Sequence, residues 1–212
     1  EGGYIVPPPE FHRELYKLTR KYGILFVADE VQSGMGRTGK MFAMEHFGVV
    51  PDIIALAKGI ASGMPLGAMV ARADIMTWEA GSHASTFGGN PVSCQAALAT
   101  LALLEESLMA NATARGEQLM AGLRELQKSI ECMGDVRGMG LMVGVELVKD
   151  RITKERAHEW RNEVIQRAFR RGLLLLGCGD STIRFCPALT ISAEEIEVGL
   201  SIFEEAVREV AG

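Results

Sequence analysis

The feature that most constrains the fold is a pair of short apolar runs, each of which ends at a charged residue. The first run, residues 24–28, leads into Asp29, and the second, residues 53–57, leads into Lys58. The first run does not alternate apolar with polar residues, a pattern typical of a central parallel strand covered on both faces. An acid at the end of one buried strand and a lysine at the end of the next suit a cofactor held between charge partners.

The remaining periodicities divide the chain into two lobes. They predict helices over residues 10–21, 41–47, 91–106, 113–129, 154–171 and 193–210, and further strands over residues 67–71, 136–146, 173–176 and 183–185. The helix over residues 91–106 is apolar nearly all round, so we expect it to be buried. The later helices are charged and amphipathic. We therefore predict an α/β lobe over residues 1–107 and a smaller α+β lobe over residues 108–212.

Composition excludes several classes of protein. The 212 residues carry a net charge of −5 without a basic run, which argues against nucleic-acid binding. Charges interrupt the apolar runs before the ~20 residues that a membrane helix needs. The four cysteines form no C-x-x-C pair and the histidines have no metal-ligand spacing, so we expect a reduced, cytoplasmic protein without a metal site. The opening Glu1-Gly2-Gly3 lacks an initiator Met and a secretory signal, which indicates part of a longer chain.

The glycine-rich segment GMGRTG, residues 34–39, invites a nucleotide-binding interpretation. In a dinucleotide site an acid follows about 20 residues later, whereas Asp52 lies 13 residues beyond Gly39. Residues 34–40 also approach a P-loop, but Met41 stands where the magnesium-binding Ser or Thr belongs. Nucleotide binding is therefore the weakest of the functional hypotheses.

The surroundings of Lys58 favour covalent chemistry. Small and apolar residues precede it, and Gly59, Gly63 and Gly67 follow, so the backbone can crowd the amine and leave room for a bulky group above it. A desolvated lysine is a nucleophile that forms an imine with an aldehyde, and pyridoxal phosphate is the natural aldehyde. Its ring nitrogen needs an anionic partner, which Asp29 can supply.

The sequence resembles a known family at these residues. The stretch GILFVADEVQSGMGRTGKMFAMEHFGVVPDIIALAKGIASGMPLGAMVAR is similar to the core of class III (subgroup II) pyridoxal-phosphate aminotransferases, which include 4-aminobutyrate, ornithine and acetylornithine aminotransferases. The similarity continues through STFGGNP, VRGMGLMVGVEL and IRFCPALTI, and so covers essentially the whole chain. The resemblance implies the C-terminal half of such a protein. Its fold would be part of a fold type I large domain, with a mostly parallel sheet and helices on both faces, plus the small α+β domain.

The resemblance also implies roles for residues that contact the cofactor. Asp29 would pair with the pyridine nitrogen, Val31 would lie against the ring, and Gln32 would lie near the phenolic oxygen. Lys58 would form the Schiff base and then move the proton between the substrate Cα and the cofactor C4′.

Other implied roles concern the phosphate and the substrate. Thr86, with Ser85 close by, would bind the cofactor phosphate of a neighbouring subunit in a homodimer with sites at the interface. Arg184 would bind a substrate carboxylate, for which its planar guanidinium is suited because it can donate two hydrogen bonds at once. Glu1 would pair with Arg184 when an ω-amino substrate binds.

The predicted function is transamination between an amine or ω-amino acid, of the 4-aminobutyrate or ornithine type, and a 2-oxo acid. An amino-acid racemase or epimerase on the same scaffold is an open alternative, because it uses the same lysine and cofactor. A non-catalytic fragment that lacks the rest of the site is another. The expected partners are small molecules and a second copy of the chain, with no nucleic acid and no membrane.

Overall fold

The structure is a computed structural model that describes residues 1–211. The chain divides into two compact units. The N-terminal unit is Pro7–Met109, and the C-terminal unit combines Glu1–Val6 with the residues from Ala110 onward. Residues 1–6 thus group with a part of the chain more than a hundred residues away. The division at residues 107 and 108 stays a prediction for the domains of the family.

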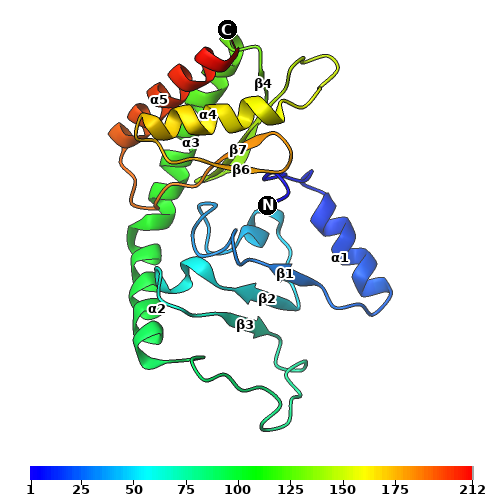
Figure 1. The fold of residues 1–212 in the computed structure, drawn as a ribbon. Helices are drawn as coiled ribbons and strands as arrows, with labels where there is room; N and C mark the ends of the chain where they lie inside the picture. Colours follow the sequence, from blue (N-terminus) through cyan, green and yellow to red (C-terminus); the bar gives the residue numbers. More distant parts are fainter. Residues whose placement is uncertain (212) are drawn as a thin grey trace. The chain divides into compact units, whose positions relative to one another are not determined.

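The N-terminal unit contains a three-stranded sheet of order β1-β2-β3 (Figure 1). Its strands are β1 (Val27–Asp29), β2 (Ile53–Leu56) and β3 (Ala68–Ala71). β1 and β2 are parallel, whereas β2 and β3 are antiparallel. The sheet of this unit is therefore mixed, as part of an α/β fold, and a mostly parallel sheet stays a prediction for the large domain as a whole. The reason for the antiparallel pairing of β2 and β3 is length, because the connection over residues 57–67 is shorter than the dozen or more residues of a parallel crossover.

β1 is an edge strand, which corrects the prediction of a central strand covered on both faces. It pairs with β2 alone among the described strands, and Val27 is 56% exposed. Its apolar run therefore faces solvent along part of its length. An unpaired parallel edge of this kind is a site at which another strand can add.

The helical segments of the N-terminal unit are α1 (Phe11–Lys21), η1 (Ala43–Phe47), η2 (Lys58–Ala61), α2 (Pro91–Leu103) and the π-helical η3 (Leu104–Leu108). The predicted burial of the helix after residue 91 is wrong: Val92 and Leu98 of α2 are 64% and 61% exposed. α2 packs through one side on the turn after β2, where the hydroxyls of Ser62 and Thr100 lie 2.8 Å apart. α2 contacts η2 on that side, whereas Val92, Leu98 and Leu103 on α2 are exposed.

Helical residues run without a break from Pro91 to Ser129, and this stretch is long and apolar enough to cross a membrane by length and composition. The finding is weak evidence for a membrane segment, because core helices of soluble proteins pass the same test. The absence of a membrane segment therefore stays a prediction.

Asp52 ties α1 to the sheet from a buried position. Its carboxylate accepts a hydrogen bond from the backbone N–H of Phe26 at 2.7 Å and pairs with the guanidinium groups of Arg20 and Arg72. The hydrogen bond from Arg20, the Phe26 N–H and the charge of both arginines hold the pKa of Asp52 below its usual value of 3.8. Arg72 thus takes part in a structural ion pair.

The depressed pKa of Asp52 gives a signed pH dependence. Because the folded state holds this proton less tightly than the unfolded chain does, the stabilisation is fully present above pH 3.8 and is lost as the pH falls through the folded pKa. Asp52→Asn should lower the thermal midpoint at pH 7 and flatten the loss of stability on acidification. Thermal unfolding followed by circular dichroism from pH 7 to pH 2 measures both. The exposed Asp74, which also pairs with Arg72, gives the control Asp74→Asn, for which we expect a smaller change. Equal midpoints for the two variants would contradict the role of Asp52.

The C-terminal unit contains a four-stranded antiparallel sheet of order β4-β5-β7-β6 and three helices. The elements are α3 (Met109–Ser129), β4 (Met133–Met139), β5 (Met142–Leu147), α4 (His158–Arg170), β6 (Leu176–Cys178), β7 (Thr182–Phe185) and α5 (Ala193–Ala211). The single strand predicted over residues 136–146 is a hairpin. It turns at Gly140, whose φ of +53° is a left-handed conformation that glycine adopts without steric cost.

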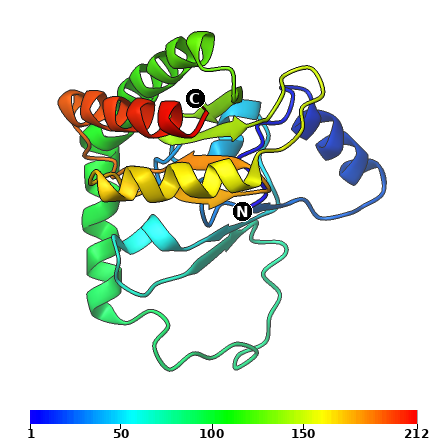
Figure 2. The ribbon, with the colours of Figure 1, turned by 45° about the horizontal axis from the view of Figure 1, so that its top comes forward.

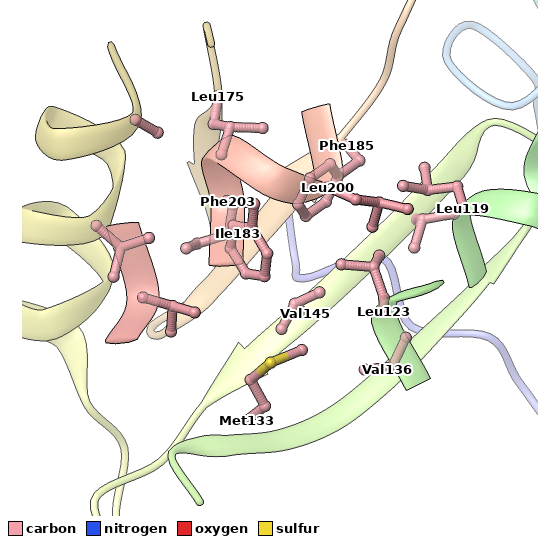
Figure 3. Close-up of a cluster of buried hydrophobic side chains, with 14 of the residues drawn as sticks. Leu119, Leu123, Met133, Val136, Val145, Leu175, Ile183, Phe185, Leu200 and Phe203 are labelled. Atoms are coloured by element: carbon pink, nitrogen blue, oxygen red, sulfur yellow. The ribbon is translucent and has the colours of Figure 1, made fainter. Parts of the chain in front are cut away.

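Alternation along β5 and β7 gives this sheet two different faces. Val143, Val145, Ile183 and Phe185 are buried in the core, which they share with residues of the three helices (Figure 3). The rings of Phe185 and Phe203 meet edge to face at 5.1 Å. α4 and α5 pack side by side (Figure 2).

The residues between those core positions point to the opposite face, since successive side chains of a strand alternate. This polar face, as we call it, carries Arg137, Glu146, Thr182 and Arg184, and the chain's first residues lie on it.

Candidate active site

The parallel pair β1 and β2 brings the predicted acid and lysine to one edge of the sheet. Asp29 is the last residue of β1 and pairs in register with Ala55 of β2. β2 ends at Leu56, and Lys58 begins η2 two residues later. Because parallel strands end at the same edge, Asp29 and Lys58 both follow the carboxyl end of the pair, where ligands bind in open α/β sheets.

The Asp29 side chain is exposed and accepts a hydrogen bond from the backbone of its own loop. Its Oδ1 accepts a hydrogen bond from the backbone N–H of Val31 at 3.0 Å, an Asx-type turn that fixes the carboxylate at the start of the loop. Among residues 1–211, no cation pairs with it. Asp29 therefore offers a negative charge to a ligand without first breaking an ion pair.

Lys58 is held in an unusual backbone conformation. Its φ is +47°, a left-handed value that costs a residue with a side chain on the order of 1–3 kcal/mol and clusters at functional sites. Lys58 is exposed, which corrects the expectation of an amine desolvated by its neighbours. Within the described residues it forms no ion pair, so its amine is accessible to an aldehyde.

The glycine-rich loop packs against the turn that contains Lys58, and the loop requires glycine at residue 34. A Cβ built on Gly59 would meet the Cβ of Met35 at 3.6 Å, so the loop packs against the turn that contains Lys58. A Cβ on Gly34 would lie 2.8 Å from the carbonyl oxygen of Glu30, too close for any other residue. Gly34 thus serves a close approach of the backbone to Glu30.

Glu30 shapes the same loop, and sequence reasoning missed it. Its side chain is buried, accepts a hydrogen bond from the Ser33 hydroxyl at 2.5 Å and another from the Met44 N–H at 2.9 Å. Its carbonyl accepts the Gly34 N–H at 3.0 Å. Since neighbouring residues of a strand point to opposite faces, the second acid of the pair Asp29-Glu30 was the available indication of a buried partner. Glu30 orders the loop that carries the half-buried Val31 and Gln32.

Ser85 and Thr86 lie together in the exposed segment before α2. The Ser85 hydroxyl accepts the Gly88 N–H at 3.0 Å, and Asn90 caps α2 by accepting the Ser93 N–H at 2.9 Å. Among the residues that the structure describes, no hydrogen bond or ion pair joins Ser85 or Thr86 to Asp29 or Lys58. Their role in phosphate binding stays a prediction.

Arg184 and Glu1 form an ion pair in the C-terminal unit. The Nη1 of Arg184 on β7 lies 2.8 Å from the Oε1 of Glu1, and the exposed fractions of their side chains are 16% and 83%. Burial alone would lower the pKa of Arg184, but the hydrogen bond and the charge of Glu1 raise it. A mostly buried arginine with an exposed carboxylate partner can exchange that partner for a ligand carboxylate.

Tyr4 is a neighbour of Arg184 that the sequence did not reveal. It is buried, and its pKa is raised by burial and by the charge and hydrogen bond of Cys186. Its backbone φ of +52° is left-handed. The tyrosine therefore stays a neutral hydroxyl beside the guanidinium and anchors the first residues of the chain.

The chain is similar to known proteins over nearly its whole length. The sequence profile of the family described as Aminotransferase class-III matches residues 1–207. Relatives include a leucine/methionine racemase of Thermococcus litoralis, 44% identical over 99% of this chain and 48% of that protein. A 4-aminobutyrate aminotransferase of Mycobacterium leprae is 46% identical over 95% of this chain and 46% of that protein.

Solved structures give the same result. The crystal structure of a transaminase from a marine Virgibacillus superposes with a TM-score of 0.93 at 33% identity, covering 99% of this chain and 50% of the other. The chain spans about half the length of the curated relatives it matches. With a profile match over nearly its whole length, the chain belongs to the class-III aminotransferase family.

Proposed function

We propose that the protein of this sequence transfers an amino group between an amine or ω-amino acid, of the 4-aminobutyrate or ornithine type, and a 2-oxo acid. The observation that carries the proposal is the placement of Asp29 and Lys58 at the carboxyl ends of two adjacent parallel strands. Class-III aminotransferases use pyridoxal phosphate. An accessible amine and an unpaired carboxylate fit a group that combines an aldehyde with a basic ring nitrogen.

The proposal gives each residue of the N-terminal unit a task. The bound cofactor would supply a protonated ring that draws electrons from the substrate Cα. Asp29 would hold the proton on the ring nitrogen by charge. Val31 would orient the ring and Gln32 would lie near its phenolic oxygen. The Lys58 amine would attach the cofactor and later move a proton at the substrate Cα.

Substrate binding is assigned to the C-terminal unit. Arg184 would bind the substrate carboxylate through two parallel hydrogen bonds from its planar guanidinium. Glu1 would form an ion pair with Arg184 when the substrate has no carboxylate at that end. Ser85 and Thr86 would bind the phosphate of the second subunit of a homodimer.

We further propose that the two units belong to the large domain and the small α+β domain of fold type I, in a cytoplasmic enzyme.

A racemase is the second candidate, because two relatives at 44% and 45% identity are named as amino-acid racemases. Both reactions need the same lysine, so the residues above do not separate them. The requirement for a second substrate does. A transaminase stops without a 2-oxo acid, whereas a racemase continues.

The deciding experiment incubates the 212-residue chain and pyridoxal phosphate with 4-aminobutyrate, ornithine or L-alanine, with and without 2-oxoglutarate. We expect glutamate to form from an ω-amino donor only when 2-oxoglutarate is present. Conversion of L-alanine to D-alanine without 2-oxoglutarate would support the racemase instead. If neither glutamate nor D-alanine forms, the result favours a non-catalytic fragment. The chain without added cofactor is the control.

A further inference from the structure

We propose that Arg137 is a positioning residue that clamps residues 3 and 4 to the polar face and thereby holds Glu1 against Arg184. The proposal rests on the proposed function, which assigns Arg184 and Glu1 to the substrate. Arg137 itself would touch no substrate. It would decide how readily Arg184 becomes available to a ligand carboxylate.

The clamp is a bidentate contact to a backbone carbonyl. Arg137 donates to the Gly3 carbonyl oxygen from Nε at 3.0 Å and from Nη2 at 2.5 Å, and Nε also reaches the Tyr4 carbonyl oxygen at 3.3 Å. The Arg137 side chain is 14% exposed. A planar fork that is largely shielded from water holds its acceptor more firmly than a single exposed donor.

The guanidinium is itself held by acids and a hydroxyl of the polar face. Nη2 lies 2.8 Å from Glu146 and 2.9 Å from the Thr182 hydroxyl, and Nη1 lies 3.0 Å from Asp135. Burial would raise the pKa of Glu146, but hydrogen bonds from Ser181, Thr182 and Arg137 hold it below its usual value. Glu146 therefore stays charged at neutral pH and fixes the position of Arg137.

The first residues fit this clamp closely. A Cβ on Gly3, whose φ is +113°, would lie 3.2 Å from Nη2 of Arg137 and 3.3 Å from the Thr182 hydroxyl. Farther along, the Gly179 N–H donates to the Glu1 carbonyl at 2.7 Å. Residues 1–4 are thus held at several points, and the Glu1 carboxylate lies at 2.8 Å from Arg184.

The placement of Arg137 connects the clamp to Arg184 through one strand. Arg137 and Arg184 both pair in register with Gly144 of β5, from its two sides. Gly144 has no side chain, and a Cβ there would lie 3.3 Å from the Cβ of Tyr4. The segment therefore crosses the sheet over Gly144, between the two arginines. Releasing Gly3 from Arg137 would remove one of the contacts that hold Glu1 near Arg184 and so weaken the Glu1–Arg184 pair.

The test uses glutarate, a dicarboxylate, as the probe, and isothermal titration calorimetry of the 212-residue chain. In Glu1→Gln the ligand no longer competes with a carboxylate for Arg184, so we expect the dissociation constant to fall by about two- to fivefold, the range for an exposed ion pair. Arg137→Gln should produce a similar fall, and the double variant should add little to either. A merely destabilising change would weaken binding instead.

The matched control is Arg151→Gln. Arg151 also donates to backbone carbonyls, those of Ile130 and Glu131 at 2.9 and 3.0 Å, but within the described part of the chain it has no hydrogen bond or ion pair with residues 1–6. We expect its glutarate affinity to equal that of the wild type. Arg137→Lys keeps the positive charge beside Glu146 but lacks the planar guanidinium. If the guanidinium positions Gly3, the glutarate dissociation constant of this variant should lie between those of the wild type and Arg137→Gln.

A second readout separates this proposal from the proposed function. The NMR resonance of the Arg184 Nη1–H group, which donates to Glu1, reports the Glu1 contact without any ligand. Arg137→Gln should move this resonance in the direction that Glu1→Gln moves it, and the lysine variant gives the same information if the glutamine variant does not fold. A resonance that stays at its wild-type position in the Arg137 variants would overturn the clamp. Matching shifts without glutarate binding would uphold the clamp and remove Arg184 from substrate binding.

Discussion

Replacing Lys58 with alanine should abolish covalent attachment of pyridoxal phosphate to this chain. The amine of Lys58 is accessible, sits at the carboxyl end of the parallel pair and has no ion-pair partner among the described residues. The experiment adds pyridoxal phosphate, removes the excess, reduces with borohydride and maps the labelled peptide by mass. We expect the wild type to carry one label at Lys58 and the variant to carry none.

The control for this prediction is Lys40→Ala. Lys40 is an exposed lysine that follows the glycine-rich segment of the same unit. If pyridoxal phosphate labelled surface amines nonspecifically, it should label Lys40 as much as Lys58. Labelling of Lys58→Ala at the wild-type level would contradict the assignment. A wild type that takes no specific label would mean that these 212 residues do not hold the cofactor by themselves.

Replacing Asp29 with asparagine should leave the cofactor attached but slow the reaction with an amino donor by about 10²- to 10³-fold, the cost typical of one lost electrostatic contact to a transition state. Asparagine keeps an oxygen that can accept the Val31 N–H, so the loop should persist, while the negative charge is lost. Stopped-flow absorbance in a single half-reaction measures the rate. The change is separable from cofactor loss because the borohydride label at Lys58 remains.

Asp29→Glu is the conservative counterpart. It restores the charge with a longer side chain, so we expect a rate between those of the asparagine variant and the wild type. A half-reaction rate in Asp29→Asn equal to that of the wild type would remove Asp29 from the mechanism. Loss of the label itself would show that Asp29 acts on binding of the cofactor and not on its reactivity.

The helices of this protein were largely predictable because their information is local. Apolar spacing predicted a helix over residues 10–21, and α1 spans Phe11–Lys21. The last helix was predicted over residues 193–210, and α5 spans Ala193–Ala211. Ser192 precedes it and its hydroxyl accepts the Glu195 N–H at 3.1 Å, as a capping residue should.

Strands and burial were less predictable, because both depend on what lies next to a segment. The run over residues 24–28 reads as a central strand, yet β1 starts at Val27 and lies at a sheet edge. The apolar helix after residue 91 reads as buried, yet Leu98 is 61% exposed. Hydrophobicity shows that a surface needs cover but not which part of a protein supplies it.

The sequence by itself determined that Asp29 and Lys58 lie at the ends of two neighbouring strands. The order of apolar run, Asp29, glycine-rich loop, apolar run and Lys58 is local, and two parallel strands are enough to bring their carboxyl ends to one edge. The tertiary structure alone decided how Glu1 meets Arg184. Arg137 reaches the Gly3 carbonyl across 134 positions of sequence, and no periodicity encodes a contact that exists only after the sheet has folded and placed its polar face under the first residues of the chain.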